Sequence, residues 1–152
     1  MIRVDRAASR MPLVQYGALP WRRTPDGLQI LLITTRKTRR WIVPKGWAEA
    51  GRSAQECAAQ EAYEEAGVSG AVSDHAIGVF NYKKQLKSGQ TVACRIRIYS
   101  MEVDVIAGDW PEKHARETKW CLVSEALILV EDPGLRRIIA KFSRAALTRK
   151  AA

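Results

Sequence analysis

The sequence predicts an α/β (α+β) domain in which a twisted, mixed β-sheet lies between helices. Three observations predict this α/β/α sandwich. Residues 53–66 have the periodicity and end signals of a helix, and segments with strand character lie before and after them. A further helix with an apolar stripe follows the last strand. The length of 152 residues suits one domain with an adequate core, so we expect a single domain over residues 1–152.

The first strands are expected at residues 12–20 and 28–35, joined by a Pro-Asp-Gly turn. The second begins with an almost unbroken apolar run, which favours a central strand buried on both faces. Residues 41–43 form a short strand that Pro44 ends, because proline has no amide hydrogen for the ladder.

The helix over residues 53–66 has signals at both ends. Ser53 and Glu56 fit a capping box, in which each side chain satisfies a free amide near the other residue. Gly67 suits the left-handed residue that ends a helix. Alanines recur at helical spacing along one arc, which allows close packing of the helix on a sheet.

Later strands are expected at residues 76–83, 91–103 and 118–123. Polar and apolar residues alternate in the second of these, as in a strand with one buried face. Asp132 before a proline opens the last helix. Its expected buried stripe contains Leu135, Ile138, Ile139 and Phe142.

The cysteines and the lack of long apolar runs indicate in which compartment the protein is found. The three cysteines, Cys57, Cys94 and Cys121, are widely spaced and form neither a disulfide framework nor a zinc pattern. The sequence shows neither a transmembrane-length apolar run nor the apolar core of a secretory signal. We therefore expect a cytoplasmic protein with no membrane partner.

The net charge of +9 arises from 25 basic and 16 acidic residues. Such an excess indicates an anionic partner. Basic residues gather just before Trp41 and again within residues 83–87. A small anionic substrate is the expected partner, while the sequence leaves the oligomeric state open.

The most informative residues are three glutamates, Glu61, Glu64 and Glu65. Their i, i+3, i+4 spacing places them on one face of the predicted helix, where like charges repel. Mg²⁺ prefers carboxylate oxygens and converts this repulsion into binding, and Mn²⁺ is expected to substitute for it. Such sites support displacement at phosphorus. The alternative is an ordinary solvated helix face.

The segment 44–68, PKGWAEAGRSAQECAAQEAYEEAGV, resembles the Nudix box. That box reads Gly, five residues, Glu, seven residues, Arg-Glu, an aliphatic residue, one residue, Glu-Glu, one residue, Gly and an aliphatic residue. The matching residues are Gly46, Glu61, Glu64, Glu65, Gly67 and Val68. The order of predicted elements also agrees with the Nudix fold.

Two positions depart from the box: Arg52 stands where the family has glutamate, and Gln60 where it has arginine. In the family these residues typically support each other as an ion pair. The double change avoids placing two positive charges together. We expect the brace between loop and helix to be absent here, with the metal ligands retained.

The resemblance implies a Mg²⁺-dependent pyrophosphohydrolase that cleaves a phosphoanhydride bond. RRWIVPKG before the helix and GVFNYKK after it look like the diphosphoinositol polyphosphate phosphohydrolase and diadenosine polyphosphate hydrolase branch. The substrate would then be a nucleoside-diphosphate-linked compound, a dinucleoside polyphosphate or a diphosphoinositol polyphosphate.

The resemblance also implies roles for particular residues. Glu61, Glu64 and Glu65 would ligate the metal, and Glu64 or Glu61 would act as the general base. Glu112 and Glu117 are alternative bases or ligands and read equally well as surface acids.

Phosphate binding is expected from positive side chains and from a backbone that can approach the ligand closely. The candidates are Arg36, Arg40, Lys45, Gly46 and Arg116.

Two other function classes remain open. The departures at Arg52 and Gln60 suit a catalytically weak Nudix domain that senses a ligand. The positive charge suits an RNA-end-processing or nucleic-acid-binding protein, although the sequence has no recognisable RNA-binding or helix-turn-helix signature.

Overall fold

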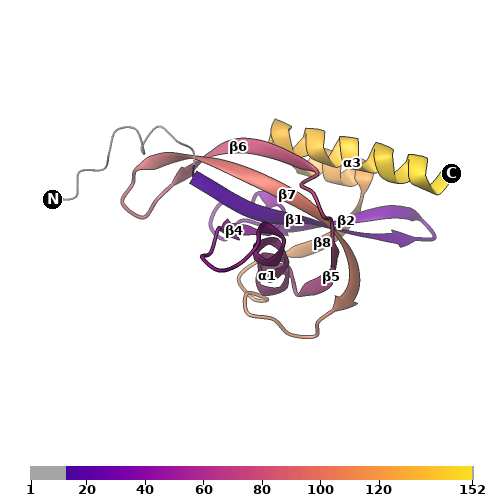
Figure 1. The fold of residues 1–152 in the computed structure, drawn as a ribbon, viewed down its shortest axis with the longest axis horizontal. Helices are drawn as coiled ribbons and strands as arrows, with labels where there is room; N and C mark the ends of the chain where they lie inside the picture. The colour runs from indigo at the N-terminus through magenta and orange to yellow at the C-terminus, as the bar shows by residue number, and fades with distance from the viewer. Residues whose placement is uncertain (1–12, 152) are drawn as a thin grey trace.

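The computed structural model describes residues 13–151, which form one mixed sheet with helices on both faces (Figure 1). In chain order the elements are β1 (Leu13–Thr24), β2 (Gly27–Thr34), β3 (Trp41–Ile42), β4 (Lys45–Trp47), α1 (Ala54–Ala66), β5 (Val68–Val72), β6 (Gly78–Gln85), β7 (Thr91–Ile106), β8 (Thr118–Leu122), α2 (Val123–Leu129) and α3 (Pro133–Ala151). The sandwich predicted from the sequence is confirmed. Residues 1–12 and 152 of the predicted single domain lie outside the described residues, so its full extent stays a prediction.

The sheet has eight described strands and the order β3-β2-β1-β7-β5, with β4 on β1, β6 on β7 and β8 on β2. The pairing of β1 with β7 is parallel and the other pairings are antiparallel. The predicted turn joins β1 to β2, where Thr24 pairs with Gly27. The centre of the sheet is therefore β1, which contacts α1 and β4 as well as its neighbouring strands.

Each face of the sheet has its own hydrophobic core. On one face, α1 packs through Ala58, Ala62 and Ala66 against a cluster that includes Leu31 and Ile33. On the other face, α2 and α3 cover a larger cluster, and the predicted stripe of α3 is buried there. The small side chains of α1 allow its backbone to approach the sheet closely, which holds the glutamate-bearing turns beside the sheet.

Two strands were not predicted. Pro44 was expected to end the strand before it, and the next residues, 45–47, form β4, which pairs with β1. Residues 68–72 form β5 along the edge of β7. Both are too short to show a clear alternating pattern, so their pairing depends on the neighbouring strands.

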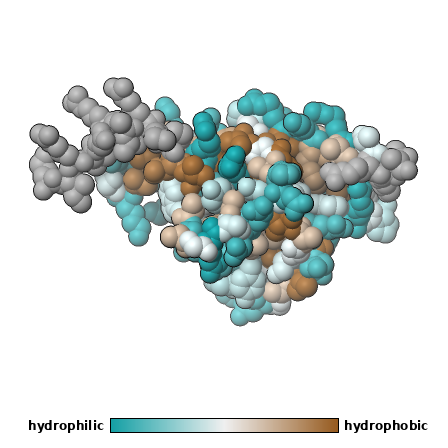
Figure 2. Space-filling model, viewed as in Figure 1, coloured by the Kyte–Doolittle hydropathy of each residue, from teal (hydrophilic) through white to brown (hydrophobic). Residues whose placement is uncertain are grey.

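Hydrophilic residues are spread over the face shown in Figure 2, interrupted by smaller hydrophobic areas. None of the helices in residues 13–151 has the length and apolar character needed to cross a membrane.

Candidate functional site

Local sequence signals determine where α1 begins and ends. The Ser53 hydroxyl accepts the Glu56 amide at 3.1 Å, and the Glu56 carboxylate accepts the Ser53 amide at 3.3 Å. Gly67 adopts φ 69° and its amide donates to carbonyls of the last turn. The predicted capping box and glycine terminus are both confirmed. They fix the register in which Glu61, Glu64 and Glu65 leave the helix.

The pairing of β4 with β1 brings the loop backbone against α1. Gly46 pairs with Tyr16, and a Cβ atom at position 46 would overlap the Glu61 carboxylate. Glycine is therefore needed at position 46 because a carboxylate occupies the space of a side chain. The predicted role of the Gly46 backbone in binding phosphate stays a prediction.

Glu61 and Glu65 face one cavity of about 280 Å³, which we call the glutamate cavity. Its walls also contain Gln15, Ile42, Lys45, Gly46, Trp47, Glu49, Lys84 and Arg116. Glu64 does not line this cavity. The structure therefore brings together two of the three predicted ligands, beside two of the predicted phosphate-binding side chains, Lys45 and Arg116.

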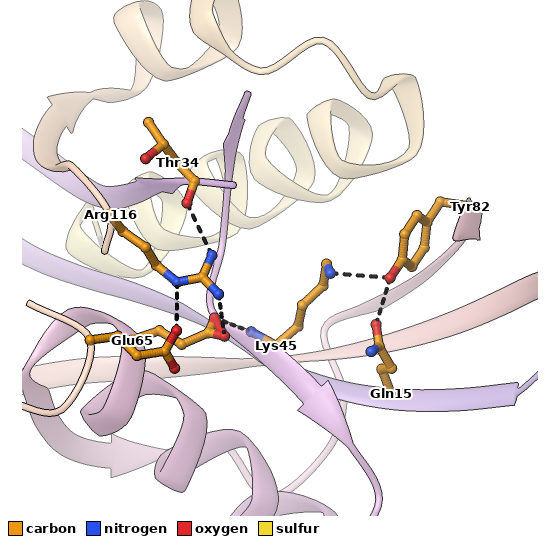
Figure 3. A network of polar contacts seen from close by, with 7 residues as sticks. Gln15, Thr34, Lys45, Glu65, Tyr82 and Arg116 are labelled. Carbon is orange, nitrogen blue, oxygen red and sulfur yellow. Dashed lines mark hydrogen bonds and ion pairs between the residues drawn. The ribbon is translucent and has the colours of Figure 1, made fainter. Parts of the chain in front are cut away.

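Glu65 is buried, with 5% of its surface exposed, and is held on both oxygens. Its Oε1 accepts the Lys45 amide at 3.2 Å, and its Oε2 lies 3.3 Å from the Arg116 guanidinium (Figure 3). Burial raises the pKa of Glu65, while Arg116 and the Lys45 amide oppose this rise. The carboxyl group is therefore fixed in place by its neighbours.

Arg116 connects three elements of the site. It donates to Glu65, to Glu112 Oε1 at 3.2 Å and to the carbonyl of Thr34 at 3.0 Å. Its guanidinium is thus already engaged by two carboxylates. The loop that carries it also binds α1 directly, since the Glu112 amide donates to the Glu64 carbonyl at 2.9 Å. Glu112 therefore contacts the site through Arg116 and α1, and its role as a base or ligand stays a prediction.

The carboxyl group of Glu61 has a strongly raised pKa. Burial raises its pKa to about 8, with further contributions from Glu65, Glu64 and Glu112. Without a cation its carboxyl group is therefore largely protonated at neutral pH. When Glu61 binds a proton, its repulsion with the neighbouring glutamates, which their spacing in the sequence predicted, is relieved.

As the side chains stand, no group of three or more His, Cys, Asp or Glu residues within 13–151 is arranged to hold a metal ion. Glu64 instead accepts the Gln60 amide at 2.6 Å. Mg²⁺ nevertheless needs only one or two carboxylates and completes its shell with water and substrate phosphate. Glu61 and Glu65 converge on the glutamate cavity and so supply the two carboxylates that such coordination needs.

The expectation that the brace between Arg52 and Gln60 is absent was wrong. The Arg52 guanidinium donates to Gln60 Oε1 and also forms an ion pair with Glu49 at 3.3 Å. The Gln60 side chain donates in turn to Glu64. A glutamine amide both accepts and donates, so it connects a cation on the loop to a carboxylate on the helix without a charge of its own.

A second cavity, of about 350 Å³, adjoins the first and shares Ile42 and Lys45 with it. We call it the aromatic cavity, because Trp41, Phe80 and Tyr82 line it. Trp41 also packs against the core cluster that α2 and α3 cover.

Lys45 lies at the junction of the two cavities. Its Nζ donates to Tyr82 OH at 3.2 Å, and Tyr82 OH donates to the buried Gln15 Oε1 at 2.9 Å (Figure 3). Burial is the main cause that lowers the pKa of Lys45 to about 8, followed by the charge of Lys84. Burial also raises the pKa of Tyr82.

The remaining predicted residues are placed as follows. Arg40 lines the aromatic cavity, whereas Arg36 and Glu117 are exposed and line neither cavity. Sequence reasoning missed Gln15 and Tyr82. Gln15 had a usable signal, because it is a polar residue within an otherwise largely apolar predicted strand.

Gly46→Ala should lower catalytic activity by about tenfold, because the added methyl group displaces the Glu61 carboxylate from the glutamate cavity. Steady-state kinetics with a fixed divalent cation measures this loss. Gly108→Ala is the matched control, since a Cβ atom there meets no heavy atom within 4 Å. Equal activity of both variants would show that the position of Glu61 is not critical.

The chain is similar in sequence to a known domain family and to several characterised proteins. The family model described as NUDIX domain matches residues 14–142. Nudix hydrolase 12, mitochondrial, from Arabidopsis thaliana is 29% identical over 120 residues, covering 77% of this chain and 59% of that protein. Human diphosphoinositol polyphosphate phosphohydrolase 3-beta is 30% identical over 104 residues, covering 67% of this chain and 59% of that protein. The chain thus spans about three fifths of the length of these relatives.

Among solved structures, the crystal structure of C. elegans Ap4A hydrolase has a similar fold, with a TM-score of 0.63 and 20% sequence identity. The match covers 90% of this chain and 99% of that structure. At this identity the likeness concerns the fold, including the sheet and the helices on its two faces.

Proposed function

This chain belongs to the Nudix hydrolase family, and we propose that it cleaves a phosphoanhydride bond in a small anionic substrate with the help of Mg²⁺ or Mn²⁺. The observation that carries this proposal is the glutamate cavity, where Glu61 and Glu65 converge beside Lys45. A carboxylate pair for a hard cation and a lysine for phosphate are the parts that such a displacement requires.

Glu61 and Glu65 would hold the cation, with Glu64 able to join them if its side chain turns from Gln60. A divalent cation in this position neutralises phosphate oxygens and lowers the pKa of bound water. We assign Lys45 the role of orienting the phosphate chain, because it lines both cavities. We assign Arg116 the role of fixing Glu65, because its guanidinium already binds two carboxylates.

For proton transfer we propose Glu64, whose carboxylate is half-buried and oriented by the Gln60 amide. Glu112, on the loop that binds α1, is the alternative base. Glu64→Gln and Glu112→Gln separate these roles, since loss of the true base lowers kcat with little change in KM.

Cation binding should release a proton from Glu61. Its pKa of about 8 means that the neutral acid predominates at pH 7, whereas a metal ligand must be ionised. Calorimetric titration with Mg²⁺ in buffers of different ionisation enthalpy measures this release. Affinity should rise from about pH 6 to about pH 8, and a pH-independent affinity would contradict the assignment of Glu61.

The raised pKa of Glu61 also determines how the stability of the metal-free protein depends on pH. Because the folded state binds the Glu61 proton more tightly than the unfolded state does, the stabilisation is complete below the ordinary glutamate pKa of 4.5 and is lost as pH rises through about 8. Lys45, with a pKa of about 8, is mostly protonated over the lower part of this window. Melting temperature should therefore fall as pH rises from about 5 to about 7.5, and added Mg²⁺ should offset the fall.

A panel of phosphoanhydrides tests the proposed function. Nucleoside triphosphates, diadenosine polyphosphates and diphosphoinositol polyphosphates are incubated with Mg²⁺ or Mn²⁺, and the products show which bond is cut. The basic residues at both cavities support faster cleavage of longer phosphate chains, with a preference that shrinks as salt screens the charges. Absence of cation-dependent turnover on every substrate would favour a ligand sensor instead. The cytoplasmic location expected from the sequence stays a prediction.

A further inference from the structure

Residues 107–117 join β7 to β8 and lie against the C-terminal end of α1; we call them the 107–117 loop. The Ala107 amide donates to the Gly67 carbonyl at 2.8 Å, and the Glu112 amide donates to the Glu64 carbonyl at 2.9 Å. Carbonyls in the last turn of a helix lack a donor within that helix, so the loop supplies the donor that Glu64 needs. The backbone of the loop is therefore bound to the turn of α1 that contains two of the glutamates.

The indole ring of Trp110 covers the residue that ends α1. A Cβ atom at position 67 would lie 2.3 Å from Cδ2 and Cε3 of this ring, so the indole occupies the space that a side chain on Gly67 would need. The Lys113 ammonium lies 5.2 Å from the ring centroid, and it also donates to the Gly108 carbonyl of the same loop. A cation at this distance is attracted to the face of the ring. Trp110 thus contacts both the end of α1 and its own loop.

Packing, and not hydrogen bonding, keeps the indole in this position. Its Nε1 atom is buried and has no hydrogen-bond partner among the residues that the structure describes. A buried N–H group without a partner costs stability, so this atom gives no reason for a tryptophan here. The carbon face over Gly67 is the part of the side chain that contributes.

The same loop contains polar side chains that hold the glutamate cavity together. Arg116 lines the cavity and binds the Glu65 carboxylate, while Glu112 accepts a hydrogen bond from Arg116. Trp110 lines neither the glutamate cavity nor the aromatic cavity. Any effect of Trp110 on the glutamates is therefore indirect, and the residues that follow it in the loop are its route.

We propose that Trp110 is a positioning residue: by packing on Gly67 it holds the 107–117 loop against α1, so that Arg116 fixes Glu65 in the glutamate cavity. This inference rests on the proposed function where it concerns turnover, whereas the packing and its effect on stability do not depend on that function. Small displacements of groups that orient a reacting centre lower rates strongly, so loss of the packing should lower kcat. Because the indole touches neither cavity, KM should change little.

Gly67→Ala tests the packing without removing a large side chain, because the added methyl group would meet the indole and displace the loop. The matched control is Gly89→Ala in the turn between β6 and β7, where φ is 85° against 69° at Gly67 and a Cβ atom meets nothing within 4 Å. Both variants have similar backbone strain, so their difference reports the contact with the indole. The kcat of Gly67→Ala should be about tenfold below that of Gly89→Ala, with KM values within about threefold. Equal kcat values would overturn the proposal.

Substitution of Trp110 itself separates the flat ring from the N–H group. Trp110→Phe keeps an aromatic ring for Gly67 and removes the N–H group that has no partner, so kcat should stay within about twofold of the wild type. Trp110→Ala should lower kcat by about tenfold or more. A loss in Trp110→Phe as large as that in Trp110→Ala would contradict the role of packing.

A double-mutant cycle with Arg116→Leu needs no turnover. If Trp110 brings Arg116 to Glu65, Arg116→Leu should cost at most about half as much stability in the Trp110→Ala background as in the wild type. The same reduction is expected in the Gly67→Ala background, which serves where Trp110→Ala does not fold. Denaturant unfolding measures each loss, and equal losses in all backgrounds would refute the route through Arg116.

The two proposals fail in different ways. A protein that shows this coupling in stability but no cation-dependent turnover refutes the proposed function and supports the role of Trp110. A protein with cation-dependent turnover, equal kcat in Gly67→Ala and Gly89→Ala, and no coupling refutes the role of Trp110 and supports the hydrolase.

Discussion

Glu61→Gln should reduce cation-dependent turnover by on the order of 10²-fold or more, and it should make the metal-free protein more stable than the wild type near neutral pH. Glutamine resembles the protonated carboxyl group that Glu61 carries without a cation, since the pKa of Glu61 is about 8. The variant therefore keeps the shape and charge of the metal-free site. It removes the negative charge that the cation needs.

Three measurements check this result: turnover, Mg²⁺ affinity by calorimetry, and melting temperature against pH. The variant should also lose the fall in stability between about pH 5 and about pH 7.5, because the titrating group is gone. Glu102→Gln, an exposed glutamate on β7, is the control for the same chemical change. Near-native turnover in Glu61→Gln would remove Glu61 from the proposed metal site.

Arg116→Leu should lower the free energy of unfolding by about 3 kcal/mol. The guanidinium and the Glu65 carboxylate are both largely buried, with 11% and 6% of their side chains exposed. Removal of the arginine leaves a buried carboxylate without its cation, and the Thr34 carbonyl loses a donor. Denaturant unfolding of the metal-free protein measures the loss.

A second substitution identifies the cause of this loss. In the Arg116→Leu background, Glu65→Gln should recover part of the stability, because it removes the uncompensated charge. Mg²⁺ should stabilise Arg116→Leu more than the wild type, since a cation replaces the missing positive charge. A loss below about 1 kcal/mol, in the range of surface pairs, would show that the pair is not effectively buried.

The departures from the Nudix box show how an incorrect structural expectation arose. Arg52 and Gln60 were correctly expected to be linked positions, but the expected consequence was a missing brace. Charge alone predicts a missing brace, because Arg52 faces no acidic partner at position 60. The amide of Gln60 joins the Arg52 guanidinium to the Glu64 carboxylate, so hydrogen bonding replaces the ion pair.

The sequence alone was sufficient for the features whose interactions are local. Ser53 and Glu56 are three residues apart, and Gly67 ends the helix through its own backbone conformation. These contacts form within one turn, so the residues themselves specify them. The sandwich was predictable for a similar reason, because the spacing of apolar residues within each segment indicates whether it forms a strand or a helix.

The tertiary structure decided which side chains make up the site. Arg116 meets Glu65 across 51 residues of sequence, and Tyr82 meets Gln15 across 67. These contacts depend on the register of β1 against β4 and β7, and on how the loop after β7 binds α1. No local pattern encodes such distances along the chain, so only the folded sheet could place Lys45 between two cavities.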